Sequence, residues 1–440
     1  MTSHTGRPPS RADQADLAEL REHGYRVHDI ESLARDQDAF AVRLPETRRA
    51  LAPGLHLESR SVDLGNGSFT NTHTLQADTR LLRTEAVSAP EGFHLRNLIT
   101  TTTSAGAVAA VSGSFSFISD DPRYRPAEPC LDLCIREGKI VSLPTTAKPA
   151  LLIRDGQPLI TTVEATGTLT LAGRPHHWAG SKTPTAAHSD PLTVYGAANC
   201  HVRYRDHPRT GFLRSVAPAT NTTPLTPDVT DLTLVPDPGG HHRVTTVHPG
   251  GGADLFTGNI VLRTHRNPAA GDALESRAPV QITTIGGHST RGFSSALSLG
   301  PSAQDAAAGR TRAWDDGYLG TSPFLDTRRA RTLIGHREQD LVLLVLDGTR
   351  HATRFLGVTP RETARICETS GLDPARMYHL DGGASSKIAY LSSGIARVAG
   401  SMHYLAWPTI PGGPFRWQGL DGRVLRSAVV LIPRQIQEYS

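Results

Sequence analysis

The stretch that decides the fold is Tyr378-His-Leu-Asp-Gly-Gly-Ala-Ser-Ser-Lys-Ile-Ala-Tyr390. In it, Asp381 ends an apolar segment typical of a strand, and the two glycines that follow free the backbone to turn and to approach a ligand closely. Successive N–H groups in such a turn can form a concavity that binds anions. The stretch therefore predicts a small pocket for a sugar or a phosphate, with a tight polar β-turn as the alternative. The predicted lining residues are Asp381, Gly382, Gly383, Ser385 and Ser386.

The sequence before this stretch predicts a strand and a helix. Residues 341–346 are all apolar and are followed directly by Asp347 and a glycine. Residues 360–370 read as a helix, because Thr359 is a good N-cap and a capping-box glutamate stands three residues later. A strand–helix–strand order favours two parallel strands with a right-handed crossover. Asp347 and Asp381 should then lie at the same edge of the sheet, where α/β sheets usually bind ligands.

The order of these blocks resembles the phosphodiester glycosidase family. Its pattern reads roughly R-T-(A/L)-(I/V)-G, an apolar strand ending in D-G, a helix, and L-D-G-G-G-S. Here Arg331-Thr-Leu-Ile-Gly335 supplies the first block, and Ala107–Phe115 matches an upstream N-G-x-F block imperfectly. The resemblance covers roughly residues 93–405; it is strong over 328–390 and faint over 175–325. It implies an enzyme that cleaves the bond between the anomeric carbon of a sugar and a phosphodiester.

The resemblance also implies roles for single residues. Asp381 and Asp347 are the expected acid pair, since glycosidic cleavage usually needs two carboxyl groups. Arg331 is the expected phosphate ligand, because a guanidinium binds phosphate oxygens as a fork, and Thr332 could donate to the same oxygens. His288, in a glycine-rich loop, is a candidate acid or base; a loop histidine without a role is the alternative.

Three positions depart from the family pattern. Ser112, followed by Gly113, stands where the family usually has Asn, and Ala384 replaces the third glycine. Lys387 stands where the family usually has a small or apolar residue; it is interpreted either as a cation for a second phosphate or as a surface residue. We still expect Ser112, Gly113 and Lys387 to bind substrate. These departures affect the expected sugar specificity more than the fold.

Composition limits the class of protein. The net charge of the 440 residues is only +4, which argues against a dedicated nucleic-acid binder. Cys130 and Cys134 lack a second pair, so we expect buried thiols in place of a zinc site, and no cofactor or metal is predicted. No secretory signal and no apolar run long enough to cross a membrane are evident, so we expect a cytoplasmic protein without a membrane partner.

The predicted fold class is α+β, with a mixed β-sheet core, few helices and long loop-rich insertions. We expect an N-terminal extension at 1–40, partly disordered, that includes a short helix from Asp16 to His23 and a second at 30–38. One catalytic domain should span 41–440 with a loop-rich insertion at about 173–325. Hairpin turns are predicted at 137–139 and at Asp155-Gly156.

Three functions remain open from the sequence. The first is a hydrolase that acts on sugar phosphodiesters. The second is a cytoplasmic tailoring enzyme of specialised metabolism, a transferase or lyase that uses the same fold on a sugar-phosphate or nucleotide-derived substrate. The third is a non-catalytic carbohydrate-binding protein, against which the presence of Arg331, Asp347 and Asp381 argues. In each case the expected partner is a small sugar-phosphate or glycoside; the oligomeric state is not indicated.

Overall fold

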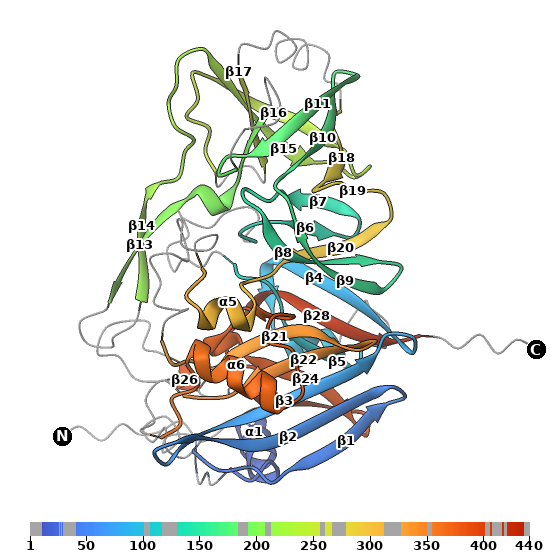
Figure 1. The fold of residues 1–440 in the computed structure, drawn as a ribbon, viewed down its shortest axis with the longest axis vertical. Coiled ribbons are helices and arrows are strands. Elements are labelled where there is room, and N and C mark those ends of the chain that lie inside the picture. Colours follow the sequence, from blue (N-terminus) through green and yellow to red (C-terminus); the bar gives the residue numbers. More distant parts are fainter. Residues whose placement is uncertain are drawn as a thin grey trace, which may run out of the picture.

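The chain is mainly β-sheet with few helices, as Figure 1 shows for the computed structural model. The expected α+β class is thus confirmed only in its coarse part, a sheet core with few helices. The structure describes residues 11–25, 27, 29, 41–100, 106–116, 130–183, 192–206, 213–255, 260–265, 279–311, 327–349, 354–400, 405–406, 416–417 and 420–434.

The sequence motifs lie in two sheets. The six-stranded motif sheet has the order β1 (Thr47–Ala52), β2 (Leu55–Gly65), β3 (Ser68–Asp78), β22 (Asp340–Leu346), β21 (Arg331–Arg337), β23 (Met377–Leu380). The five-stranded C-terminal sheet has the order β25 (Ile395–Gly400), β24 (Lys387–Ser392), β5 (Ala109–Ser112), β28 (Leu425–Pro433), β4 (Leu82–Phe93). Apolar side chains from both sheets share one core cluster, so the two sheets are packed together.

Strand β22 shows why the apolar run at 341–346 is continuous. Its odd-numbered residues pack into the core shared with the C-terminal sheet, and its even-numbered residues pack on the opposite face. That opposite face is covered by α6 (Pro360–Thr369) and includes Ala303 of α5 (Ala303–Ala307). A strand buried on both faces has no polar face to alternate.

The predicted helix and strand directions around α6 are confirmed. Thr359 caps the helix, and its Oγ1 accepts from the Glu362 N–H at 3.2 Å while the Glu362 carboxylate accepts from the Thr359 N–H at 2.9 Å. Both β22 and β23 pair antiparallel with β21, which lies between them, so they run in the same direction. Their carboxyl ends, at Asp347 and Asp381, therefore meet at the same sheet edge.

Two further helices cover the ends of these sheets. Helix α1 (Arg11–Glu22) confirms the helix predicted from Asp16 to His23, although it begins earlier, and Gly24 follows it with a φ of +90°. Helix α3 (Leu95–Thr100) packs on the outer face of the C-terminal sheet. The second helix predicted for the extension, at 30–38, lies outside the described residues.

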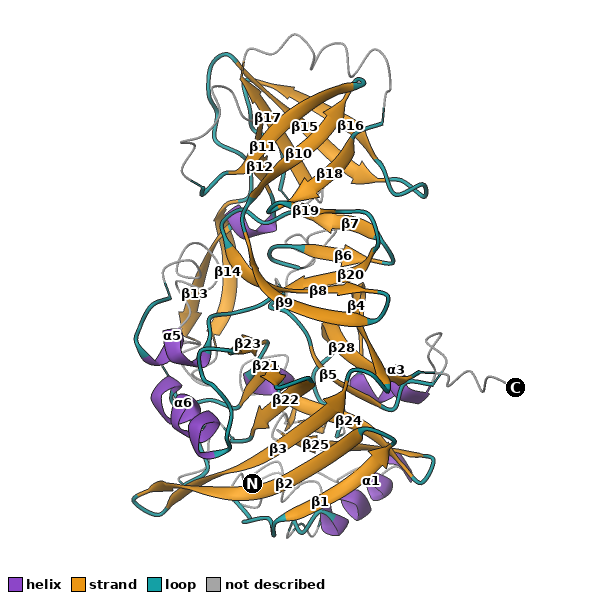
Figure 2. Cartoon of the chain, turned by 45° about the vertical axis from the view of Figure 1, so that its right-hand side comes forward, coloured by secondary structure: helices purple, strands orange, loops and turns teal. Residues whose placement is uncertain are grey.

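A bridging sheet connects this body to a larger sheet (Figures 1 and 2). Its order is β7 (Lys139–Ser142), β6 (Cys134–Arg136), β20 (Phe293–Ser298), β8 (Lys148–Arg154), β9 (Gln157–Val163). Both predicted hairpins are present here. At one of them, Asp155 and Gly156 have φ values of 52° and 71°, the left-handed pair that a two-residue hairpin turn favours.

The expected loop-rich insertion is more regular than its composition suggested. It supplies most of an eight-stranded outer sheet with the order β16 (His242–Pro249), β15 (Val229–Pro236), β17 (Ile260–His265), β12 (Leu192–Tyr195), β11 (Arg174–Gly180), β10 (Thr166–Leu171), β18 (Gln281–Ile285), β19 (His288–Ser289). This sheet shares a core cluster with the bridging sheet. The described part of the insertion therefore contains many strands that pair into a sheet. Two hairpins complete the fold: β13 (His201–Asp206) with β14 (Leu213–Thr220), and β26 (Leu405–Ala406) with β27 (Arg416–Trp417).

No helix among the described residues is long and apolar enough to cross a membrane.

Candidate functional site

Three segments that are distant in sequence meet where β23 ends. The Ser112 Oγ, at the end of β5, lies 3.1 Å from Thr332 Oγ1 on β21 and 2.9 Å from the Asp381 carbonyl oxygen. The Asp381 N–H donates to the Gly113 carbonyl at 2.8 Å. A Cβ atom at Gly113 would lie only 2.6 Å from Ser427 Oγ, so the close approach of β28 requires glycine there. The motif sheet and the C-terminal sheet are thus connected at this edge.

The turn after β23 holds the Asp381 carboxyl group in place. Gly383 has a φ of +63° and donates its N–H to the Ala330 carbonyl at 2.7 Å, which positions the short 3₁₀ turn Gly383–Ser385. From that turn, Ser385 Oγ donates to Asp381 Oδ2 at 2.7 Å. Burial raises the pKa of Asp381, while the charge of Arg423 and the hydrogen bonds from Ser385 and the Gly382 backbone oppose the rise.

The second carboxyl group, Asp347, is buried at the end of β22. The Gly348 N–H donates to its Oδ1 at 2.8 Å, and His73 Nε2 lies 4.0 Å from its Oδ2. The Tyr25 hydroxyl also bonds to this carboxylate; burial raises the pKa of Tyr25 most, and the charge of Asp347 and this bond add to the rise. Both acids of the predicted pair therefore occupy the same sheet edge, each held by neighbouring donors.

Cations gather beside this edge on the C-terminal sheet. Lys387 is buried at the start of β24, and its Nζ donates to the Asp421 carbonyl at 2.7 Å. Burial lowers the pKa of Lys387 to about 7, partly offset by the charge of Asp421. Arg96 of α3 places Nε 3.2 Å from Asp421 Oδ1. Together with Arg423, whose charge acts on both Asp381 and Lys387, these residues form what we call the edge cluster: Arg96, Lys387, Asp421 and Arg423.

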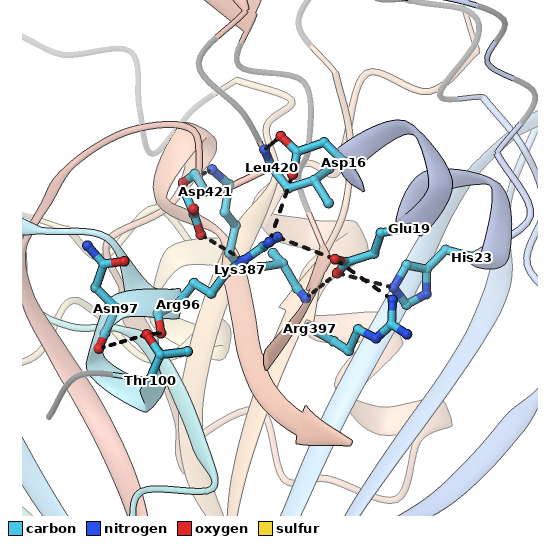
Figure 3. Close-up of polar contacts among 11 residues, drawn as sticks. Asp16, Glu19, His23, Arg96, Asn97, Thr100, Lys387, Arg397, Leu420 and Asp421 are labelled. Atoms are coloured by element: carbon cyan, nitrogen blue, oxygen red, sulfur yellow. Dashed lines mark hydrogen bonds and ion pairs between the residues drawn. The ribbon is translucent and has the colours of Figure 1, made fainter. Parts of the chain in front are cut away.

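Helix α1 closes over the edge cluster. Figure 3 shows Arg96 between Asp421 and the carboxylates of α1, with Glu19 at 3.5 Å and Asp16 at 3.8 Å. The same helix is fixed to the sheet through backbone donors, since Val398 N–H donates to Glu19 and Leu420 N–H donates to Asp16. The sheet edge thus combines the two buried carboxyl groups with three cationic side chains, those of Arg96, Lys387 and Arg423.

Residues 267–410 match the phosphodiester glycosidase family. This match spans about a third of the chain and includes Asp347, Asp381 and Lys387. It confirms the resemblance inferred from the sequence blocks. A search of curated proteins found no significant match.

A solved structure shows a similar fold. A hypothetical protein from Synechocystis is 14% identical with a TM-score of 0.50, over 89% of this chain and 64% of that chain. The chain thus spans less than two thirds of that protein. A Burkholderia pseudomallei protein described as exported is 18% identical with a TM-score of 0.49, over 83% and 74% of the two chains. The catalytic domain of zebrafish N-acetylglucosamine-1-phosphodiester alpha-N-acetylglucosaminidase is 13% identical with a TM-score of 0.39, over 93% and 94%. The similarity to the Synechocystis protein shows the fold alone.

Arg331, the phosphate ligand expected from the glycosidase pattern, has a different position. It alternates with Thr332 along β21, so its side chain lies on the face of Leu333, away from Ser112. It is fully buried and donates to the carbonyls of Thr327, at 2.8 Å, and Val358, at 3.2 Å. These contacts hold loop backbone against β21, and the phosphate contact expected of Arg331 stays a prediction.

His288 is also placed elsewhere. It lies on β19 of the outer sheet, 6.4 Å from the Phe293 ring, and lines a pocket with Arg154 and Gln157. The structure therefore places His288 apart from the sheet edge that holds Asp381, and its role as an acid or base stays a prediction. The remaining predicted residues lie at or beside the sheet edge: Ser112, Gly113, Thr332, Gly382, Gly383, Ser385, Ser386 and Lys387. Ser386 is buried, and its Oγ makes no hydrogen bond with the described residues.

The sequence contained one signal for the edge cluster that the motif search missed. The tripeptide Leu-Asp-Gly occurs at 346–348, 380–382 and 420–422, and the third copy supplies Asp421 one residue before the Gly422-Arg423 pair. All three copies lie at this end of the two sheets. Arg96, His73 and Tyr25 have no such local signal.

No group of three or more His, Cys, Asp and Glu side chains in the described part of the chain could hold a metal ion.

Proposed function

We propose that the protein hydrolyses the bond between the anomeric carbon of a sugar and a phosphodiester oxygen. The observation that carries this proposal is that Asp347 and Asp381 end two strands of the same direction at one edge of the motif sheet. The cationic edge cluster lies next to them, and the family match covers both carboxyl groups.

The two carboxyl groups have different surroundings, which suggests different roles. A raised pKa makes the Asp381 carboxylate a stronger base, so it is suited to take a proton from the attacking water. Asp347 would stabilise the positive charge that develops at the anomeric carbon. Water adds to that carbon, the carbon–oxygen bond breaks, and its electron pair stays on the phosphate.

The edge cluster would bind the phosphate. A phosphodiester is already a weakly basic leaving group, so binding its negative charge matters more than protonating it. Arg423 and Arg96 can donate several N–H groups to phosphate oxygens, and Lys387 adds a compact cation. The cluster thereby takes the place that the sequence pattern had assigned to Arg331.

The test uses methyl phosphodiesters of sugar 1-phosphates in water labelled with heavy oxygen. Hydrolysis at the anomeric carbon places the label in the released sugar, whereas phosphodiesterase chemistry places it in the phosphate, and mass spectrometry separates the two. Label found only in phosphate, or no turnover across a panel of sugars, would reject the proposal.

Asp381→Asn should lower kcat by about 10²–10⁴-fold, because it keeps the shape and removes the base. The matched control is Asp155→Asn in the β8–β9 turn, an exposed position where asparagine tolerates the positive φ. Turnover of Asp381→Asn within a few-fold of the control would exclude Asp381 as the base.

A further inference from the structure

His73, whose Nε2 lies 4.0 Å from Asp347 Oδ2, also lines a cavity of about 140 Å³. It opens between strands of the two packed sheets, below the end of α1. Its polar lining comes from elements far apart in sequence: His23, Thr47, Arg49, Ser59, His73 and Tyr390. We call it the His73 cavity; it was not indicated by the sequence motifs, and all but Tyr390 and Ala399 of its lining lies outside the family match.

His73 is the residue that points to a ligand. Only 3% of it is exposed, its Nδ1 lies 2.9 Å from Ser59 Oγ, and its Nε2 has no hydrogen-bond partner among the described residues. Burial, together with the charge of His23, lowers the pKa of His73 to about 3, so the ring is neutral near pH 7. A neutral imidazole has one donor and one acceptor nitrogen, and leaving one of them unpaired in a buried site is costly.

The size of the cavity limits its occupant. One water molecule needs about 10–15 Å³ of cavity volume, measured as the space open to the centre of a water-sized sphere. The 140 Å³ of this cavity therefore corresponds to roughly ten water-sized groups. A single pyranose ring with its hydroxyls is of that size, and a disaccharide is too large.

The chemistry of the lining favours a hydroxyl-rich ligand, with the Arg49 guanidinium as a further donor. Thr47, Ser59 and Tyr390 provide hydroxyls, which both donate and accept. The negative charge of Glu22 is already paired with Arg397 at 2.8 Å, so it does not repel or attract a ligand strongly. Leu57 and Ala399 supply apolar surface for the ring carbons. The edge cluster, in contrast, is suited to an anion.

We propose that the His73 cavity binds the pyranose ring of the substrate, with His73 Nε2 on one of its hydroxyls. His73 then connects the bound ring to the carboxylate assigned to the anomeric carbon, because His73 lines the cavity and its Nε2 lies 4.0 Å from Asp347 Oδ2. This assignment of the ring to the substrate rests on the proposed function. Binding of a free monosaccharide in the cavity does not depend on the proposed function. The cavity and the hydrolytic activity can therefore be tested separately.

The binding test uses calorimetry and saturation-transfer NMR on the full chain with N-acetylglucosamine, glucose and mannose as probes. At least one should bind the wild type in the millimolar range, which is usual for so small a ligand. Ala399→Leu fills the cavity and should weaken this binding by about tenfold or more, as should Ser59→Ala, which removes the partner that orients His73. Ser294→Ala, an exposed serine of the bridging sheet, is the matched control and should bind like the wild type.

The outcomes separate the cavity from the proposed function. If Ala399→Leu does not fold, Ser59→Ala decides alone. No monosaccharide binding to the wild type, or binding unchanged in the variants, overturns the cavity proposal. Sugar binding without any phosphodiester hydrolysis leaves the cavity standing and rejects the activity. Phosphodiester hydrolysis with an unchanged kcat/KM in Ala399→Leu leaves the activity standing and rejects the cavity as the site of the sugar ring.

Discussion

Two buried or half-buried arginines in this molecule are surrounded very differently. In the outer sheet, Arg263 meets Asp231 as a two-pronged pair at 2.7 and 2.9 Å, and its remaining donors reach Pro224 and Thr226. At the sheet edge, Arg96 lies 3.2–3.8 Å from three carboxylates, and its Nε and Nη2 make no hydrogen bond with the described residues.

This difference distinguishes an arginine that stabilises the fold from one whose guanidinium can bind a ligand. An ion pair whose donors and acceptors are all hydrogen-bonded has none free to bind a ligand. Removing one partner of such a buried pair is strongly destabilising. A guanidinium with loose, long contacts keeps its directional donors available. The Arg263–Asp231 pair thus fits a role in stability, and Arg96 fits the binding role proposed for the edge cluster.

The largest expected effect is on folding stability. Arg263→Met leaves Asp231 buried without its partner and should lower the free energy of unfolding by roughly 3–5 kcal/mol. Arg96→Met, at a partly exposed site with long contacts, should cost less than about 1 kcal/mol. Urea denaturation of both variants measures the difference. Equal losses would mean that Arg96 is a structural residue and that the comparison fails.

The second expected effect is a pH dependence that belongs to Lys387. In the unfolded chain the pKa of lysine is about 10.4, whereas burial lowers it to about 7 in the fold. Between these values the unfolded state binds more protons, so Lys387 makes stability rise with pH, by at most ~1.4 kcal/mol per pH unit. In Lys387→Met this contribution should vanish, and the variant should be more stable near pH 7.

The control for that measurement is Lys139→Met at the start of β7, which should keep the slope of the wild type. Denaturation curves at several pH values above 7 give the slopes. A slope in Lys387→Met equal to that of the control would show that Lys387 remains protonated in the fold.

The smallest expected effect concerns inorganic phosphate. If the edge cluster binds it, saturating phosphate should stabilise the wild type by roughly 1–3 kcal/mol through mass action. Arg96→Met and Arg423→Ala should lose most of this gain in a thermal-shift experiment, while Arg154→Met, on the bridging sheet, should retain it. Full protection in Arg96→Met would place the anion elsewhere.

The sequence predicted the parts of the site that depend on local pattern. The apolar run before Asp347, the capped helix α6 and the glycine turn after Asp381 each follow from a few neighbouring residues. Arg331 shows the limit of such patterns. One residue along a strand reverses the face, so Thr332 reaches Ser112 while its neighbour Arg331 lies on the other side.

Long-range pairing accounts for the rest. In the sequence, the strands of the outer sheet look unrelated to one another, because their pairing partners are distant. Both β15 and β12 pair with β17 across intervening segments. Arg96, Tyr25 and His73 lie far before the motifs, and only the folded sheets bring them to Asp347 and Asp421. No window of sequence contains that information.

Helix α1 lies so close to Arg96 that the carboxylates of the helix and a bound phosphate would share this one arginine. Arg96 already faces Asp16 and Glu19, so a phosphate that binds to it competes with the carboxylates of the helix. Such competition is reciprocal: whatever free energy the helix subtracts from phosphate binding, bound phosphate subtracts from the attachment of the helix. Helix α1 and the anion are therefore thermodynamically linked, because both bind the same guanidinium.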